Sequence, residues 1–99
     1  MITRYVFIKL DDEHANDEGR SEAAQQLRTA LAGVPQVEGW AVGVPADPAS
    51  EGSWDLGLQV HFANLDDLAL YIDHPVHRDV VDTWLKPRMV CIKAWNFHA

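Results

Sequence analysis

The segment WDLGLQVHFANLDDLALYIDHPVH, residues 54–77, decides the fold class because a strand pattern in it passes directly into a helix pattern. Apolar and polar residues alternate over residues 54–62, which is the period of a strand with one buried face. The residues expected on that face are Leu56, Leu58, Val60 and Phe62, and those expected on the other are Asp55, Gln59 and His61. Asn64 then provides an N-cap for a helix that carries Leu65, Leu68, Tyr71 and Ile72. A strand joined to a helix in this way is typical of a layered α+β domain.

The rest of the chain adds three strands and one helix. Strands are predicted over residues 2–10, 36–44 and 89–97, which are rich in β-branched and aromatic side chains. A helix is predicted from an N-cap at Ser21 to a stop at Gly33, and residues 45–53 have the composition of a loop. The helix after Asn64 is expected to break before Pro75, to resume to about Leu85 and to end because of Pro87. The order β-α-β-β-α-β over one domain, residues 1–99, predicts a ferredoxin-like subunit: a four-stranded antiparallel sheet with its helices on one face.

The other face of that sheet predicts a homodimer. It would carry Tyr5 and Phe7 and one register of the last strand, which is too much aromatic surface to leave exposed to water. A symmetric dimer that packs the two sheets together would bury it and form a dimeric α/β barrel. His61 is expected at this interface. The four tryptophans, Trp40, Trp54, Trp84 and Trp95, are interpreted as core and interface residues.

Composition excludes several kinds of partner. The chain has 15 acidic and 8 basic side chains, a formal charge of −7, and a dense acidic run at residues 11–19. Such a surface repels phosphate backbones, so nucleic acid is not expected as a partner. The apolar run at the N-terminus is too short for a membrane span, and a single cysteine, Cys91, fits a reducing compartment, so the chain is expected in the cytoplasm. No cofactor is expected, because no phosphate loop, flavin or nicotinamide fingerprint is present.

The run YIDHPVHRDV, residues 71–80, holds the candidate chemistry. His74 precedes a proline, so it should leave helical geometry and cap a new helix that begins at Pro75. The break between His74 and His77 argues against a shared metal, and no metal site is expected. His77 lies on a stripe with Val80, Val81 and Trp84 that should face the sheet, and a helix N-terminus should keep its ring neutral. Two interpretations stay open: a general base with Tyr71 as oxyanion donor, or a buried histidine beside a tyrosine that only packs.

The segment VHFANLDDLALYIDHPVHRDVV, residues 60–81, resembles the Dabb family of stress-responsive dimeric α/β-barrel proteins. The resemblance rests on the strand ending at Phe62, the helix closing on Tyr71 and the HPVH element, and the first strand and the terminal WNF fit the same pattern. It implies a ferredoxin-like subunit that pairs with a twin. One plant branch of the family closes a linear polyketide, using a tyrosine and a histidine that match Tyr71 and His77.

Two positions depart from that plant branch. Asn96 stands where the branch has an aspartate supporting the histidine, and Arg4 stands where it has a histidine. The resemblance therefore implies that Asn96 orients His77 and that Arg4 favours an acidic ligand. The predicted ligand-binding residues are Arg4, Val6, Ile8, Leu58, Val60 and His74.

Three functions are compatible with these residues. The first is a dimer with a small apolar pocket that binds a ligand or protects under stress without chemistry. The alternative is a cofactor-free enzyme, similar to a polyketide cyclase, that acts on a small acidic carbonyl compound through His77 and Tyr71. The third is a subunit of a larger catabolic complex.

Overall fold

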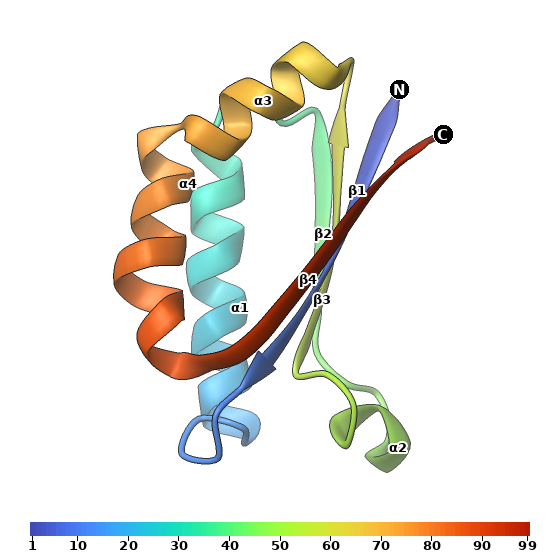
Figure 1. Ribbon diagram of the computed structural model, residues 1–99. Helices are drawn as coiled ribbons and strands as arrows, with labels where there is room; N and C mark the ends of the chain where they lie inside the picture. Colours follow the sequence, from blue (N-terminus) through green and yellow to red (C-terminus); the bar gives the residue numbers. More distant parts are fainter.

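The computed structural model describes all residues, Met1–Ala99, as one sheet with its longer helices on one face and the short helix of residues 48–51 beside the opposite face (Figure 1). The strands are β1 Ile2–Leu10, β2 Gly39–Gly43, β3 Leu56–Phe62 and β4 Met89–His98. The helices are α1 Asp17–Ala32, α2 Pro48–Glu51, α3 Leu65–Asp73 and α4 Pro75–Asp79, and a π-helix Val80–Leu85 and a 3₁₀ turn Lys86–Arg88 follow α4. The strand order is β2-β3-β1-β4 and every pairing is antiparallel. This architecture confirms the predicted ferredoxin-like α+β fold.

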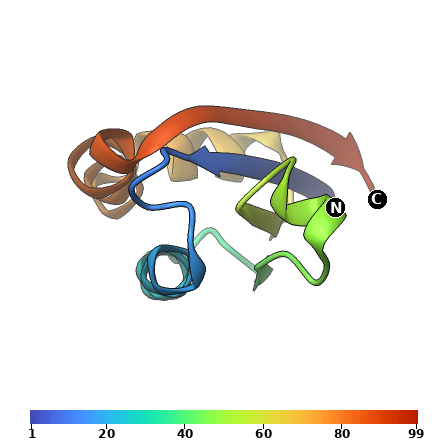
Figure 2. The ribbon, with the colours of Figure 1, turned by 90° about the horizontal axis from the view of Figure 1, so that it is seen from below.

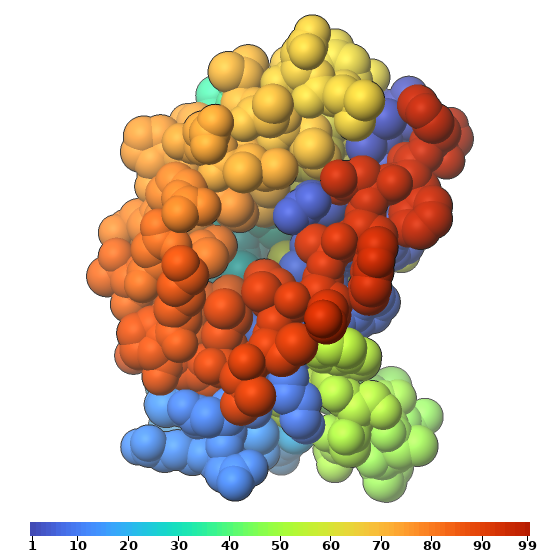
Figure 3. All heavy atoms as spheres, viewed as in Figure 1, coloured from blue at the N-terminus to red at the C-terminus, as the bar shows by residue number.

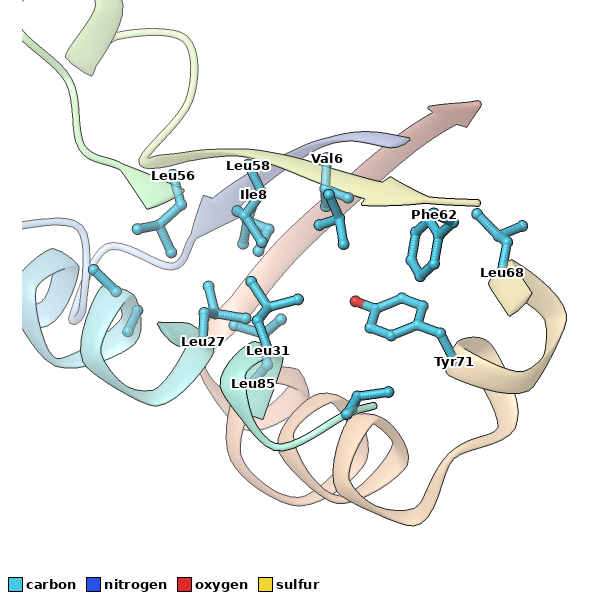
Figure 4. Close-up of a cluster of buried hydrophobic side chains, with 14 of the residues drawn as sticks. Val6, Ile8, Leu27, Leu31, Leu56, Leu58, Phe62, Leu68, Tyr71 and Leu85 are labelled. Atoms are coloured by element: carbon cyan, nitrogen blue, oxygen red, sulfur yellow. The ribbon is translucent and has the colours of Figure 1, made fainter. Parts of the chain in front are cut away.

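The core lies between the sheet and the helices. Seen along the sheet, α1 and the α4 segment lie on the same side of it (Figure 2). The predicted inward face of β3 is confirmed, because Leu56, Leu58, Val60 and Phe62 are all buried. Their side chains meet those of Leu27, Leu31, Leu68, Tyr71 and Leu85 from the helices (Figure 4). None of the helices has both the length and the apolar character needed to cross a bilayer.

Four local predictions need correction. Helix α1 begins at Asp17 and not after Ser21, because the side chain of Asn16 accepts a hydrogen bond from the backbone N–H of Gly19 and caps the helix a turn earlier. The predicted loop contains the short helix α2, which Asp47 caps by accepting from Ser50 N–H. β2 is shorter than predicted at each end. The helical run after α4 widens into a π-helix, in which Lys86 N–H donates to the carbonyl of Val81.

Asp55 was expected on the exposed side of β3, but it is 0 % exposed. It lies just before β3, and its carboxylate accepts from the backbone N–H of Leu10 at 2.7 Å and from Nε of Arg20 at 3.0 Å. Asp55 therefore joins the end of β1, the start of β3 and the first turns of α1. A buried carboxylate is stable in this position because both of its oxygens have donors.

The sheet face away from the helices carries a row of contacting aromatic rings. Tyr5 packs edge-on against Phe97, and Phe7 contacts both Trp54 and Trp95, with ring centroids 5.7–6.4 Å apart. Trp95 is 50 % exposed and Phe97 is 56 % exposed. We call this surface the bare face. In a single subunit it leaves large apolar groups in water, as the sequence predicted.

Candidate functional site

A cavity lies between the sheet and the helices, at the free edge of β4. In Figure 3 it is the hollow between the orange α4 segment and red β4, with atoms of β1 and α1 visible at its base. Its volume is about 40 Å³. One water needs roughly 10–15 Å³ of such space, so the cavity admits a few waters or a slender ligand. The lining residues are mostly apolar: Arg4, Val6, Ile8, Leu27, Ala30, Leu31, Val34, Leu58, Tyr71, His77, Val80, Val81, Leu85 and Ile92.

His77 lines this cavity and is held in place by one of its ring nitrogens. His74 ends α3 in extended geometry and its side chain accepts from Val76 N–H, so α4 begins at Pro75, as the sequence predicted. His77 is thereby turned inward, and its Nδ1 lies 2.9 Å from the carbonyl oxygen of Ile72. A carbonyl only accepts, so Nδ1 carries the proton and Nε2 keeps a free lone pair in the neutral ring.

Burial keeps His77 neutral. It lowers the pKa of the imidazole, and the positive charges of Arg4 and Arg78 lower it further, whereas the bond to Ile72 opposes the shift. A neutral ring was expected from the helix N-terminus, but desolvation is the main cause of the lowered pKa. A neutral imidazole with a free Nε2 can accept a proton or a hydrogen bond from a ligand.

Tyr71 places a phenol beside this imidazole. Its ring lies 4.3 Å from the ring of His77 and 5.0 Å from that of Phe62, measured between centroids. The residue is 5 % exposed, and burial raises the pKa of its hydroxyl to about 12. The hydroxyl points into the space between the sheet and α1 (Figure 4) and has no hydrogen-bond partner in the protein. It therefore stays protonated and available as a donor.

Arg4 supplies the third polar group. Its side chain leaves the central strand β1 on the helix side, and Nη1 donates to Oδ1 of Asn96, its neighbour on β4, at 3.0 Å. Burial lowers the pKa of the guanidinium, and Arg4 lines the same cavity as Tyr71. The implied role of Asn96 needs correction, because Asn96 contacts Arg4 and the carbonyl of Ile72 holds His77.

The cavity gathers most, but not all, of the predicted site residues. Arg4, Val6, Ile8, Leu58, Tyr71 and His77 line it, whereas Val60 is packed in the core and His74 serves as the cap of α4. The predicted ligand-binding set lacked the residues from α1 and the turn after it, from the π-helix and from β4, although Val80 and Val81 were expected on the inward stripe with His77. These lining residues are Leu27, Ala30, Leu31, Val34, Val80, Val81, Leu85 and Ile92. The helical spacing of the apolar residues predicted which face of α1 is buried. No local sequence pattern indicated which part of that face would line the cavity. The structure brings together no three His, Cys, Asp or Glu side chains in an arrangement that could hold a metal ion.

Comparison with known proteins finds one protein family whose model matches the chain and several solved structures with the same fold. The model described as the Stress Responsive A/B Barrel Domain, Dabb, matches residues 2–94. No protein of curated function matches the chain.

Three solved structures illustrate the fold. A Dabb family protein from Mesorhizobium loti has a TM-score of 0.82 at 18 % identity, covering 99 % of this chain and 95 % of its own. A dimeric ferredoxin-like protein of unknown function from Bacteroides fragilis has a TM-score of 0.80 at 22 % identity, with the same coverage. The hydroxynitrile lyase of Passiflora edulis has a TM-score of 0.78 at 14 % identity, covering 97 % and 90 %. At these identities the likeness concerns the fold alone.

Proposed function

Because the chain belongs to the Dabb family of stress-responsive A/B barrel domains, we propose that it is a homodimer whose subunits each bind a small, largely apolar ligand. The ligand lies in the cavity between the helices and the sheet. The observation that carries the proposal is that His77, Tyr71 and Arg4 line one cavity, while His77 Nε2 and the Tyr71 hydroxyl have no hydrogen-bond partner in the protein.

Two polar groups of the cavity wall have unused hydrogen-bonding capacity. Neither Nε2 of His77 nor the hydroxyl of Tyr71 has a hydrogen-bond partner in the protein. A ligand that donates to Nε2 and accepts from the phenol would use both groups. Apolar walls with a few converging polar groups are typical of small-molecule sites. No chemistry is required for this function, which amounts to ligand sequestration or protection under stress.

The dimer would be formed by the bare face. On this face, the edge strand β4 carries the large side chains of Trp95 and Phe97. The opposite edge strand, β2, carries only the small residues Gly39, Ala41 and Gly43. A two-fold axis parallel to the strands would pack the aromatic side chains of each copy against the small residues of the other. The dimeric neighbours of the same fold support this assembly.

The single cysteine, Cys91, is free, and this fits a protein of the reducing cytoplasm.

The pocket can be tested by filling it. In Val81→Phe a larger ring enters the cavity wall, so binding of the neutral probe pentanamide, followed by NMR titration, should weaken at least about tenfold. Val44→Phe makes the same change at an exposed valine outside the cavity and should bind as the wild type does. Equal binding by all three proteins, with thermal melts showing that each is folded, would refute the pocket as the ligand site.

A second candidate function is proton transfer on a small carbonyl compound. The observation in its favour is that His77, with its free Nε2, and Tyr71 line one cavity, and that the centroids of their rings lie 4.3 Å apart. Nε2 would take a proton from a carbon next to the carbonyl, and the phenol would donate to the developing enolate oxygen. The same imidazolium could return the proton, so the chemistry needs neither a cofactor nor a redox partner.

Deuterium exchange tests this second function. 4-Oxopentanoate in D₂O should exchange the hydrogens beside its ketone faster with the protein than in buffer, and His77→Gln should lose that acceleration. Because the pKa of His77 lies below its ordinary 6.5, the base form prevails at pH 7, and the rate should fall only at lower pH. Exchange that is equally fast in His77→Gln would exclude this base.

A further inference from the structure

We infer that the ligand of this cavity is a slender monocarboxylate, with its carboxylate on Arg4 and its unbranched apolar body against Leu27, Leu31 and Leu85. The inference rests on the proposed ligand-binding function and adds the chemical class and the orientation of the ligand. The basis for a carboxylate is Arg4, which carries the one full positive charge in the cavity wall.

Half of the eight cations of this acidic chain have no anionic partner, and Arg4 is the one of these that lines the cavity. Arg20 contacts Asp55, Arg78 and Lys86 both contact Asp82, and Lys9 lies near Asp55. Arg88 is also half-buried, but it donates to the carbonyl of Trp84 and lies over that indole ring. Arg4 is half-buried with only the neutral amide of Asn96. A partly desolvated cation facing a cavity is stabilised by any anion that enters it.

The geometry of Arg4 leaves donors free for that anion. A guanidinium has five N–H donors in a planar fork, and one from Nη1 is taken by Asn96. That bond anchors the fork to the neighbouring strand, so a carboxylate can meet it with little loss of side-chain freedom. Burial lowers the pKa of Arg4, but an arginine remains charged throughout the neutral range.

A single negative charge fits better than a phosphate. The other titratable groups in the wall, His77 and Tyr71, are both held neutral at pH 7, so they offer hydrogen bonds and no second positive charge. A phosphate dianion entering this apolar space would leave part of its charge unmatched. The narrow volume and the apolar wall of Leu27, Leu31 and Leu85 suit an unbranched aliphatic chain.

A matched pair of probes tests the inference. Pentanoate and pentanamide have the same length and shape but differ in charge, so the ratio of their affinities, measured by NMR titration, isolates the carboxylate. The wild type should prefer pentanoate by about tenfold or more, since hydrogen bonds to a charged group are the stronger kind. Arg4→Gln should bind the two probes equally. Arg28→Gln, at an exposed arginine whose Nη2 bonds the carbonyl of Val42, should keep the preference.

A second variant allows the inference to be tested even if Arg4→Gln does not fold. Asn96→Asp is nearly isosteric and places a carboxylate on Nη1 of Arg4, so it should abolish the pentanoate preference and leave pentanamide binding unchanged. Equal affinity of the wild type for both probes would overturn the carboxylate inference while leaving the proposed ligand pocket intact. A preference that survives both variants would overturn the role of Arg4. Binding of neither probe would overturn the inference together with the pocket.

Discussion

Asp55→Ala is expected to lower the free energy of unfolding by about 3–5 kcal/mol, the usual cost of removing one partner from a buried ion pair. The carboxylate of Asp55 is fully buried and accepts from Arg20 Nε at 3.0 Å and from Leu10 N–H at 2.7 Å. Alanine leaves the buried guanidinium with only the longer contacts to Asp17 and Glu51, at 3.7 and 3.8 Å, and leaves the backbone N–H without an acceptor. Urea unfolding followed by circular dichroism measures the loss, which is a large part of the stability of a small domain.

Asp82→Asn provides the matched control. Asp82 bridges Arg78 and Lys86 at about the same distances, but all three side chains are substantially exposed. Surface ion pairs contribute little, so this variant should unfold close to the wild type. If Asp55→Ala were as stable as Asp82→Asn, the buried pair would not hold β1, β3 and α1 together.

Trp95→Glu is expected to convert the dimer into single chains. Trp95 lies in the row of aromatic contacts on the bare face, and in a two-fold dimer each substitution occurs twice. Two carboxylates would then be buried in an apolar contact without partners, at a cost of several kcal/mol. Sedimentation equilibrium at micromolar concentration should give twice the 11.1 kDa chain mass for the wild type and the single mass for the variant.

Leu70→Glu is the control for this effect. Leu70 is 56 % exposed, like the aromatic residues of the bare face, but it lies on α3, on the helix side of the sheet. This variant should remain dimeric. Dissociation of Leu70→Glu together with a dimeric Trp95→Glu would place the contact on the helices and reject the bare face.

Much of the fold could be predicted because its signals are local. Alternation in β3 and the caps at Asn64 and His74 each act within a few residues, and the structure bears them out. The errors arose where another residue made an interaction that overrode the local sequence pattern. Asn16 caps α1 before Ser21 can, and Asp55 continues the polar register of β3 but is drawn inward by Arg20.

The candidate site was predictable only in part, because its contacts join distant parts of the chain. Tyr71 and His77 lie close in sequence on two short helices, so their proximity follows from the break at His74. The contact of Asn96 with Arg4 depends on the register of β4 against β1, which no local pattern fixes. The sequence also carried no sign of the π-helix.

The claim at the centre of this account is that His77 turns an unprotonated Nε2 toward a ligand in the cavity. Long-range ¹H–¹⁵N NMR of the imidazole measures this directly, first in the free protein and then with saturating pentanamide. We expect a proton on Nδ1, held by the carbonyl of Ile72, and an Nε2 resonance that moves as the probe binds. A proton on Nε2 in the free protein, or an Nε2 signal that the probe leaves unmoved, would contradict the account.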